Sequence, residues 1–527
     1  MFSNTSTVLN YFKDRWILWL AVVAFIAYKI PHLYYPFYWD ESWSYEPAIR
    51  LMYQHGASLM PNAIDTDYSR GHPLLFYFCA AAWMKIFGPS AFSQHAFALL
   101  LFVLLIISAY EVCRHLFNKR TALLTLAIFP LQVIFFVQST MLLPEIMVAL
   151  LSLLSIYFYS TRKHILTFIS LLALLLTKES GMVTGLLLGT DAIIKLFSKT
   201  TPQKERLANF LPVLFAGMGI AGFFIAQRLL NGWFFFPEHI GYISFGWAYD
   251  WDKIKYMVQI LFNDDCRRYL FCIVLLGSVI IAIKTRKTKY LLPLLIAVQV
   301  YICISGGYGH LISRRVLALT LMLSVVGMSK VLRAFTGTND KASSTFIQLG
   351  IYFIVLYICF CAVNFYTTRY TIPALLMVLI LTCYYLDRMI ALIYAPIYIA
   401  VLMAIALIGI YGLRNSKGLG DTNMGAFDGM KLQQEIVQYL QRNQYYTNYI
   451  TASSYQDYAH LTDPNTGFIQ QKEFIHVEKQ ITDTTQLVIF NNIEPSGIYD
   501  GIKNKYKNSL IYRTEHNGLW AEIYRLK

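Results

Sequence analysis

Two adjacent carboxylates, Asp40 and Glu41, lie in "YYPFYWDESWSYEPAIRL" (residues 34–51), directly after the first strongly apolar stretch of the chain. Arg70 and His72 follow in the same polar segment. A carboxylate at a membrane surface can act as general base toward a hydroxyl or amine, and a guanidinium group binds phosphate through two parallel hydrogen bonds. Together these groups suit transfer of a group from a lipid-linked phosphate donor.

Five further ionisable residues stand at or near the ends of apolar runs, where charge is costly: Glu145, Lys178, Arg314, Arg315 and Arg369. Plainer interpretations exist for them, because Glu145 could simply pair with Lys178, and Arg314 and Arg315 could anchor a helix at the interface. If they converge instead on one cavity, the basic groups would bind a lipid phosphate.

A divalent metal ion is a further expectation for this surface. Asp40 and Glu41, or Asp65 and Asp67, offer the carboxylate oxygens that hard cations prefer. In a polar loop, however, Asp65 and Asp67 are more often residues of a solvated turn. Metal dependence is therefore left open.

The composition is that of a polytopic membrane protein. Of the 527 residues 57% are hydrophobic and only 14% are charged, which is too few to cover a soluble globule of this size. The net charge of +14 would suggest a nucleic-acid partner in a soluble protein, but Lys and Arg retained on cytoplasmic loops explain it here. We expect a lipid bilayer and no nucleic acid as partner.

Thirteen apolar runs are long enough to be transmembrane helices, and one more, residues 73–87, is ambiguous. If residues 73–87 do not cross, the basic residues of alternate loops all fall on the side of the N-terminus, as the positive-inside rule requires for the cytoplasm. The thirteen runs lie near residues 16–34, 91–113, 121–138, 141–160, 164–177, 181–197, 207–230, 268–284, 290–305, 316–332, 346–366, 371–387 and 389–412.

This topology divides the chain into a transmembrane domain, residues 1–412, and an external domain, residues 413–527. The transmembrane domain has its first external loop at about 35–90, with interfacial helices. In the external part, "DGMKLQQEIVQYLQRN" has helical periodicity, and "NYITAS", "QLVIFN", "SLIYRT" and "LWAEIYRL" are typical of strands, which indicates a small α/β domain. We expect an integral protein of a bacterial inner membrane, with a cytoplasmic N-terminus and a periplasmic C-terminal domain.

Four ordered motifs resemble those of the GT-C polyprenyl-phosphate-sugar glycosyltransferases, in the branch of the protein O-mannosyltransferases and lipid A aminoarabinose transferases. "YWDESWSY" is similar to the Asp-Glu motif of the family's first external loop. "SRGHPLLFYFCAAAWMKIFG", "LLLTKESGMV" and "TTRYTIPALL" resemble its His/Lys-Pro-Pro-Leu, Thr-Lys-Gly and Arg-Tyr-x-x-Pro segments. The sequence departs from the family pattern at Leu74, where a second Pro is usual, and at Glu179, where Gly is usual.

The resemblance implies an inverting transfer of a sugar from an undecaprenyl- or dolichyl-phosphate donor to a protein, lipid or glycan acceptor. It implies that Asp40 is the general base with Glu41 as its support or as a metal ligand, and that Glu145 serves the same cavity. Lys178 and Arg369 would contact the lipid phosphate, and His72 would lie near it.

Two other classes of protein compete with this interpretation. A transporter or lipid flippase predicts internal repeats and helices interrupted at mid-membrane depth, and the sequence shows no convincing repeat. An O-antigen polymerase or ligase would use the same arginines, but the early Asp-Glu motif argues against it.

Overall fold

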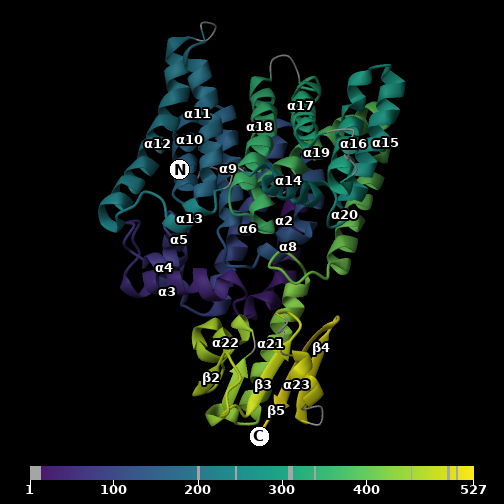
Figure 1. Cartoon of the computed structure of the whole chain (residues 1–527). Helices are drawn as coiled ribbons and strands as arrows, with labels where there is room; N and C mark the ends of the chain where they lie inside the picture. The colour runs from purple at the N-terminus through teal and green to yellow at the C-terminus, as the bar shows by residue number, and fades with distance from the viewer. Residues whose placement is uncertain are drawn as a thin grey trace.

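The structure is a computed structural model, and it describes residues 14–198, 202–243, 246–306, 313–336, 340–452, 454–494, 499–505 and 509–527. A bundle of helices makes up most of the molecule, and a small α/β domain at the C-terminus lies beyond one end of the bundle (Figure 1). The predicted architecture, a polytopic helical membrane protein with a small C-terminal α/β domain, is confirmed.

Nine helices in the described part of the chain are long and apolar enough to cross a membrane, and each coincides with a predicted span. α2 (Trp16–Lys29), α16 (Leu292–Ser305), α19 (Ile372–Ile393) and α20 (Tyr398–Asn415) are each extended by a short 3-10 turn. The others are α6 (Ala91–Leu116), α12 (Gln203–Asn231), α15 (Arg267–Thr285), α17 (Arg314–Arg333) and α18 (Lys341–Val363).

Shorter helices occupy the other four predicted spans, so the number thirteen is not established. They are α7 (Lys119–Ile128) with α8 (Val133–Gln138), α9 (Glu145–Ser160), α10 (His164–Leu175) and α11 (Met182–Leu196). Between α7 and α8 the 3-10 turn η3 (Phe129–Leu131) contains Pro130, which has no N–H to donate and therefore interrupts the helical ladder.

The segment between α2 and α6 forms short helices rather than a further span. It contains the π-helical turn η2 (Glu41–Tyr45), α3 (Glu46–His55), α4 (Thr66–Ser69) and α5 (Leu75–Phe87). α5 corresponds to the ambiguous run 73–87, and its 13 residues extend only about 20 Å, against the roughly 30 Å of a bilayer core. Between α12 and α15, the described residues likewise include two short helices, α13 (Pro237–Gly241) and α14 (Trp247–Phe262).

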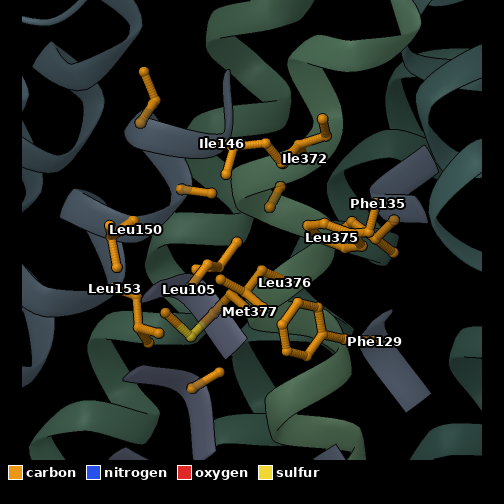
Figure 2. Packing of buried hydrophobic residues seen from close by; sticks show 14 of the residues in the cluster. Leu105, Phe129, Phe135, Ile146, Leu150, Leu153, Ile372, Leu375, Leu376 and Met377 are labelled. Atoms are coloured by element: carbon orange, nitrogen blue, oxygen red, sulfur yellow. The ribbon is translucent and has the colours of Figure 1, made fainter. Parts of the chain in front are cut away.

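The core of the bundle is built around α19, which is buried on nearly all sides. It packs against α7, α9, α15 and α18, and a helix that is apolar all round requires such an environment. Figure 2 shows Leu375, Leu376 and Met377 of α19 among the side chains of this cluster, with Ile146 beside Ile372 at the starts of α9 and α19. This packing fixes the first turns of the two helices relative to each other.

The C-terminal domain consists of one five-stranded mixed sheet with helices. The sheet order is β2-β1-β3-β5-β4, in which β1 pairs in parallel with β2 and β3, whereas β5 pairs antiparallel with β3 and β4. The strands are β1 (Tyr449–Ala452), β2 (His476–Glu478), β3 (Leu487–Asn491), β4 (Leu510–His516) and β5 (Leu519–Arg525). The helices are α21 (Gly425–Arg442), α22 (Tyr455–Thr462) and α23 (Tyr499–Lys505). The predicted helix and four predicted strands are present, and the edge strand β2 is an addition.

Candidate functional site

A cavity of about 940 Å³ lies where the helical bundle meets the linker to the C-terminal domain. Its wall comes from segment 35–90, from the 3-10 turns η4 (Glu179–Gly181) and η6 (Thr368–Thr371), from α13, and from linker residues 420–423. The ionisable residues that line it include Asp40, Arg70, His72, Lys178, Glu179, His239, Arg369 and Asp421. This volume lies in the range of small-molecule sites and would accommodate a sugar phosphate.

Arg369 is the centre of a buried charge network at this cavity. Its guanidinium group donates to the carboxylates of Asp40 and Asp421, and its Nε lies 3.3 Å from Glu145 Oε1. Lys178 Nζ donates to the same Glu145 oxygen at 2.7 Å. Two cations thus face three carboxylates, and the network carries a formal charge of −1 when all are ionised.

Residues at, or directly before, the starts of four helical elements make up most of this network. Arg369 lies in η6, which leads into α19, and Glu145 is the first residue of α9, where the helix dipole favours a carboxylate. Lys178 has extended backbone between α10 and η4, and Asp40 directly precedes η2. Because α9 packs directly against α19, Glu145 and Arg369 lie side by side at the starts of the two helices.

Glu41 faces away from the cavity although it is the neighbour of Asp40. Its side chain is fully buried and accepts hydrogen bonds from the backbone N–H groups of Tyr38 and Leu142. His95 Nε2 lies 3.3 Å from Glu41 Oε1. Both carboxylate oxygens are therefore engaged by protein groups, and Glu41 does not line the cavity.

The exposed fractions of the three carboxylates on Arg369 distinguish their access to the cavity. The side chain of Asp40 is 23% exposed, compared with 13% for Asp421 and 3% for Glu145. Burial raises the pKa of Asp421 above its ordinary value, although the charge of Arg369 opposes the shift. Asp40 is thus the carboxylate of the network that is most open to a ligand.

A second group of polar side chains surrounds His72. Its Nδ1 lies 2.6 Å from Glu179 Oε2, and its ring centroid lies 4.9 Å from that of His239. Burial, assisted by the charge of His72, lowers the pKa of His239 to about 4. Arg70 stacks over the ring of Trp43 at 5.0 Å and makes no salt bridge to any carboxylate of the described residues.

Not every predicted residue reaches the cavity. Asp40, Arg70, His72, Lys178 and Arg369 line it, and Glu145 supports it from behind through Lys178 and Arg369. Arg314 and Arg315 lie instead at the start of α17 and are not among the lining residues.

Sequence reasoning missed Asp421, Glu179 and His239 as residues of the site. Asp421 lies in "KGLGDTNMG", a glycine-rich stretch directly after the last span, and its position beside the membrane was the available signal. Glu179 was noted only as a departure from a motif. His239 carried no signal, because the aromatic segment around it indicates an interfacial location and not a ligand.

Residues 71–226 match the family model described as dolichyl-phosphate-mannose-protein mannosyltransferase. The predicted resemblance to the GT-C glycosyltransferases is therefore confirmed over that segment, which contains two of the four motifs.

Two solved structures of ArnT from Cupriavidus metallidurans are also similar to the chain. The apo form has 12% identity and a TM-score of 0.41, and covers 95% of this chain and 97% of that one. The form bound to undecaprenyl phosphate has 13% identity and a TM-score of 0.42, and the match covers 99% of this chain and 98% of that one. No curated protein matches the chain.

Proposed function

We propose that this protein is a membrane glycosyltransferase that moves a sugar from a polyprenyl-phosphate donor to an acceptor on the external face, with inversion at the anomeric carbon. The family match over residues 71–226 supports the reaction class. The observation that carries the proposal is the Asp40 carboxylate, held by the buried Arg369 at the wall of a cavity lined by further cations.

Asp40 is the proposed general base. An acceptor hydroxyl or amine in the cavity would transfer its proton to Asp40 as its oxygen or nitrogen attacks the anomeric carbon, and the bond from that carbon to the phosphate oxygen would break. The hydrogen bond to Arg369 holds the carboxylate in one orientation. Glu145 orients Arg369 and Lys178 rather than reacting, because it is nearly fully buried.

The leaving polyprenyl phosphate needs positive charge that is not already neutralised. Lys178 and Arg369 are both paired with carboxylates, whereas Arg70 forms no salt bridge within the described residues and interacts with Glu238 only at longer range. We therefore assign Arg70 to the donor phosphate, with His72 beside it and Lys178 as a further contact. The planar guanidinium group provides the bidentate geometry that a phosphate requires.

A transfer assay with the matched variants Asp40→Asn and Asp67→Asn tests the proposal. Reconstituted protein would be given a radiolabelled polyprenyl-phosphate sugar and candidate protein, lipid and glycan acceptors. We expect Asp40→Asn to lower the transfer rate by about 10²–10⁴-fold, as is usual for loss of a general base. Asp67 is an exposed residue of the same segment, and Asp67→Asn should leave the rate unchanged. Full activity of Asp40→Asn would refute the assignment.

The location of the protein and its metal dependence complete the proposal. We place the protein in a bacterial inner membrane. The distribution of basic loops supports its orientation, with the N-terminus in the cytoplasm and the C-terminal domain in the periplasm. A divalent ion on Asp40 and Glu41 stays a prediction, and treatment of the assay with a chelator tests it. The engagement of both Glu41 oxygens by protein groups favours a metal position elsewhere.

A further inference from the structure

Three side chains in the cavity, those of His72, Glu179 and His239, form a group outside the Arg369 network. One potential ligand atom from each lies within 4.8 Å of the others. We propose that these residues bind one divalent transition-metal ion of the Zn²⁺ class, with two imidazole nitrogens and one carboxylate oxygen as protein ligands.

The three residues come from separate elements that close packing brings together. His72 lies between α4 and α5, Glu179 begins η4, and His239 lies in α13. Gly71, next to His72, has φ +70°, and a Cβ atom there would lie 2.6 Å from the ring of Trp233 and 3.1 Å from Phe236 Cβ. Only glycine permits this approach, so the backbone carrying His72 rests directly on the segment that leads into α13.

A hydrogen bond between His72 and Glu179 alone does not account for the arrangement. That bond, at 2.6 Å, uses one nitrogen of one imidazole. His239 lies with its ring 4.9 Å from that of His72, and neither of its ring nitrogens forms a hydrogen bond with any residue that the structure describes. A metal ion between the three residues would engage both rings and the carboxylate at once.

The ligand types indicate the class of metal. Imidazole favours Zn²⁺ and neighbouring transition metals over Mg²⁺ or Ca²⁺, and two His with one Glu is a ligand set of zinc sites that keep a fourth position open. That open position would face the cavity, which Arg70 and Lys178 also line. An anionic oxygen ligand suits it, and if the proposed function holds, this ligand is the donor phosphate.

Metal binding can be measured without any transfer reaction. Tag-free protein in detergent, stripped with chelator, would be titrated with Zn²⁺ by calorimetry and with Co²⁺ by visible absorption. We expect one equivalent of either ion to bind, with a Co²⁺ spectrum typical of nitrogen and oxygen ligands. His72→Gln, Glu179→Gln and His239→Gln should each weaken binding by at least about tenfold. His55→Gln, which changes an exposed histidine at the end of α3, is the matched control.

The outcomes separate the metal site from the proposed function. Thermal melting in detergent shows which variants remain folded, and Zn²⁺ should raise the melting temperature of the unmodified protein and of His55→Gln, but not of the three ligand variants. No stoichiometric binding, or equal binding by folded His239→Gln, overturns the metal site even if sugar transfer is observed. Stoichiometric binding without any sugar transfer leaves the metal site standing and counts against the glycosyltransferase.

Discussion

The pairing of Glu145 with Lys178 makes an asymmetric prediction about stability. Glu145 contacts two cations, Lys178 at 2.7 Å and Arg369 at 3.3 Å. Lys178 has Glu145 as its one ionic partner among the described residues, with the Tyr45 hydroxyl at 3.5 Å and the ring of Tyr370 at 4.3 Å as its other polar contacts. Removing Glu145 therefore leaves Lys178 without a counter-ion, whereas removing Lys178 leaves Glu145 paired with Arg369.

Glu145→Gln should destabilise the protein more than Lys178→Met does. The first change leaves a buried ammonium group without a counter-ion, and such a loss typically costs about 3–5 kcal/mol unless the group releases its proton. The second leaves Glu145 with Arg369, so we expect about 1–3 kcal/mol, mostly from the lost hydrogen bond. In the double variant no buried charge is left without a counter-ion. Its loss of unfolding free energy should therefore be smaller than the sum of the two single losses by about 1–3 kcal/mol.

Unfolding in mixed detergent micelles, followed by the intrinsic fluorescence of the protein, measures these differences. The three variants and the unmodified protein would be compared at one detergent composition and one pH. Equal destabilisation by the two single changes, or additive costs in the double variant, would refute the reasoning that Lys178 depends on Glu145. The double variant should still be deficient in sugar transfer, because restored stability does not restore the orientation of Arg369.

Two further predictions concern the C-terminal part of the chain. Asp421→Asn should tighten binding of the donor phosphate several-fold, because the Arg369 network loses one of the negative charges that oppose a phosphate in the same cavity; unchanged or weaker binding of a polyprenyl phosphate in a displacement assay would contradict this. His460 is buried against Phe468, with ring centroids 3.7 Å apart, and burial lowers its pKa to about 3. Because the folded state keeps this imidazole neutral, its contribution to the free energy of unfolding is complete above the unfolded-state pKa of about 6.5 and is lost as the pH falls toward 3. At pH ~5 the free energy of unfolding should be lower by about 2 kcal/mol. His460→Leu should remove that part of the pH dependence between pH ~7.5 and ~5 in the same unfolding experiment, and an unaltered slope would count against it.

The helices were predictable from the sequence because their signal is local. A long, predominantly apolar run is sufficient to identify α6 or α18, and the short apolar run bounded by polar residues in "QLVIFN" is sufficient to identify β3. β2 was missed because three half-buried residues at a sheet edge produce no periodicity. The break between α7 and α8 follows from Pro130, but an apolar run conceals it when composition alone is counted.

The sequence predicted which residues belong to the site, but not which of them contact one another. Asp40 and Arg369 are 329 positions apart, and only tertiary packing of the first segment of short helices against the start of α19 brings them together. Adjacency in the sequence was misleading in the opposite direction. Asp40 and Glu41 are neighbours, but one contacts Arg369 at the cavity while the other holds the backbone of Tyr38 and Leu142 in the interior.

Lys178 and Glu179 diverge in the same way, and this divergence organises the cavity. Lys178 has φ −162° and ψ 150°, an extended conformation in which successive side chains point to opposite sides. Lys178 consequently joins the Arg369 network through Glu145, and Glu179 joins His72. The cavity thus has a carboxylate-rich group that includes Asp40 and a second group that includes His72, with Arg70 also on its wall.

An inverting displacement requires this kind of separation. The base and the departing phosphate must lie on opposite sides of the anomeric carbon. If they lay on the same side, the negative charges of the carboxylate and the phosphate would repel each other. The network around Arg369 carries a formal charge of −1, which suits a proton acceptor and repels a phosphate. Arg70 forms no salt bridge with any carboxylate of the described residues and suits the phosphate. We infer that the acceptor binds beside Asp40 and the donor phosphate beside Arg70 and His72, so that Arg70→Gln should raise the donor KM while the acceptor KM stays unchanged.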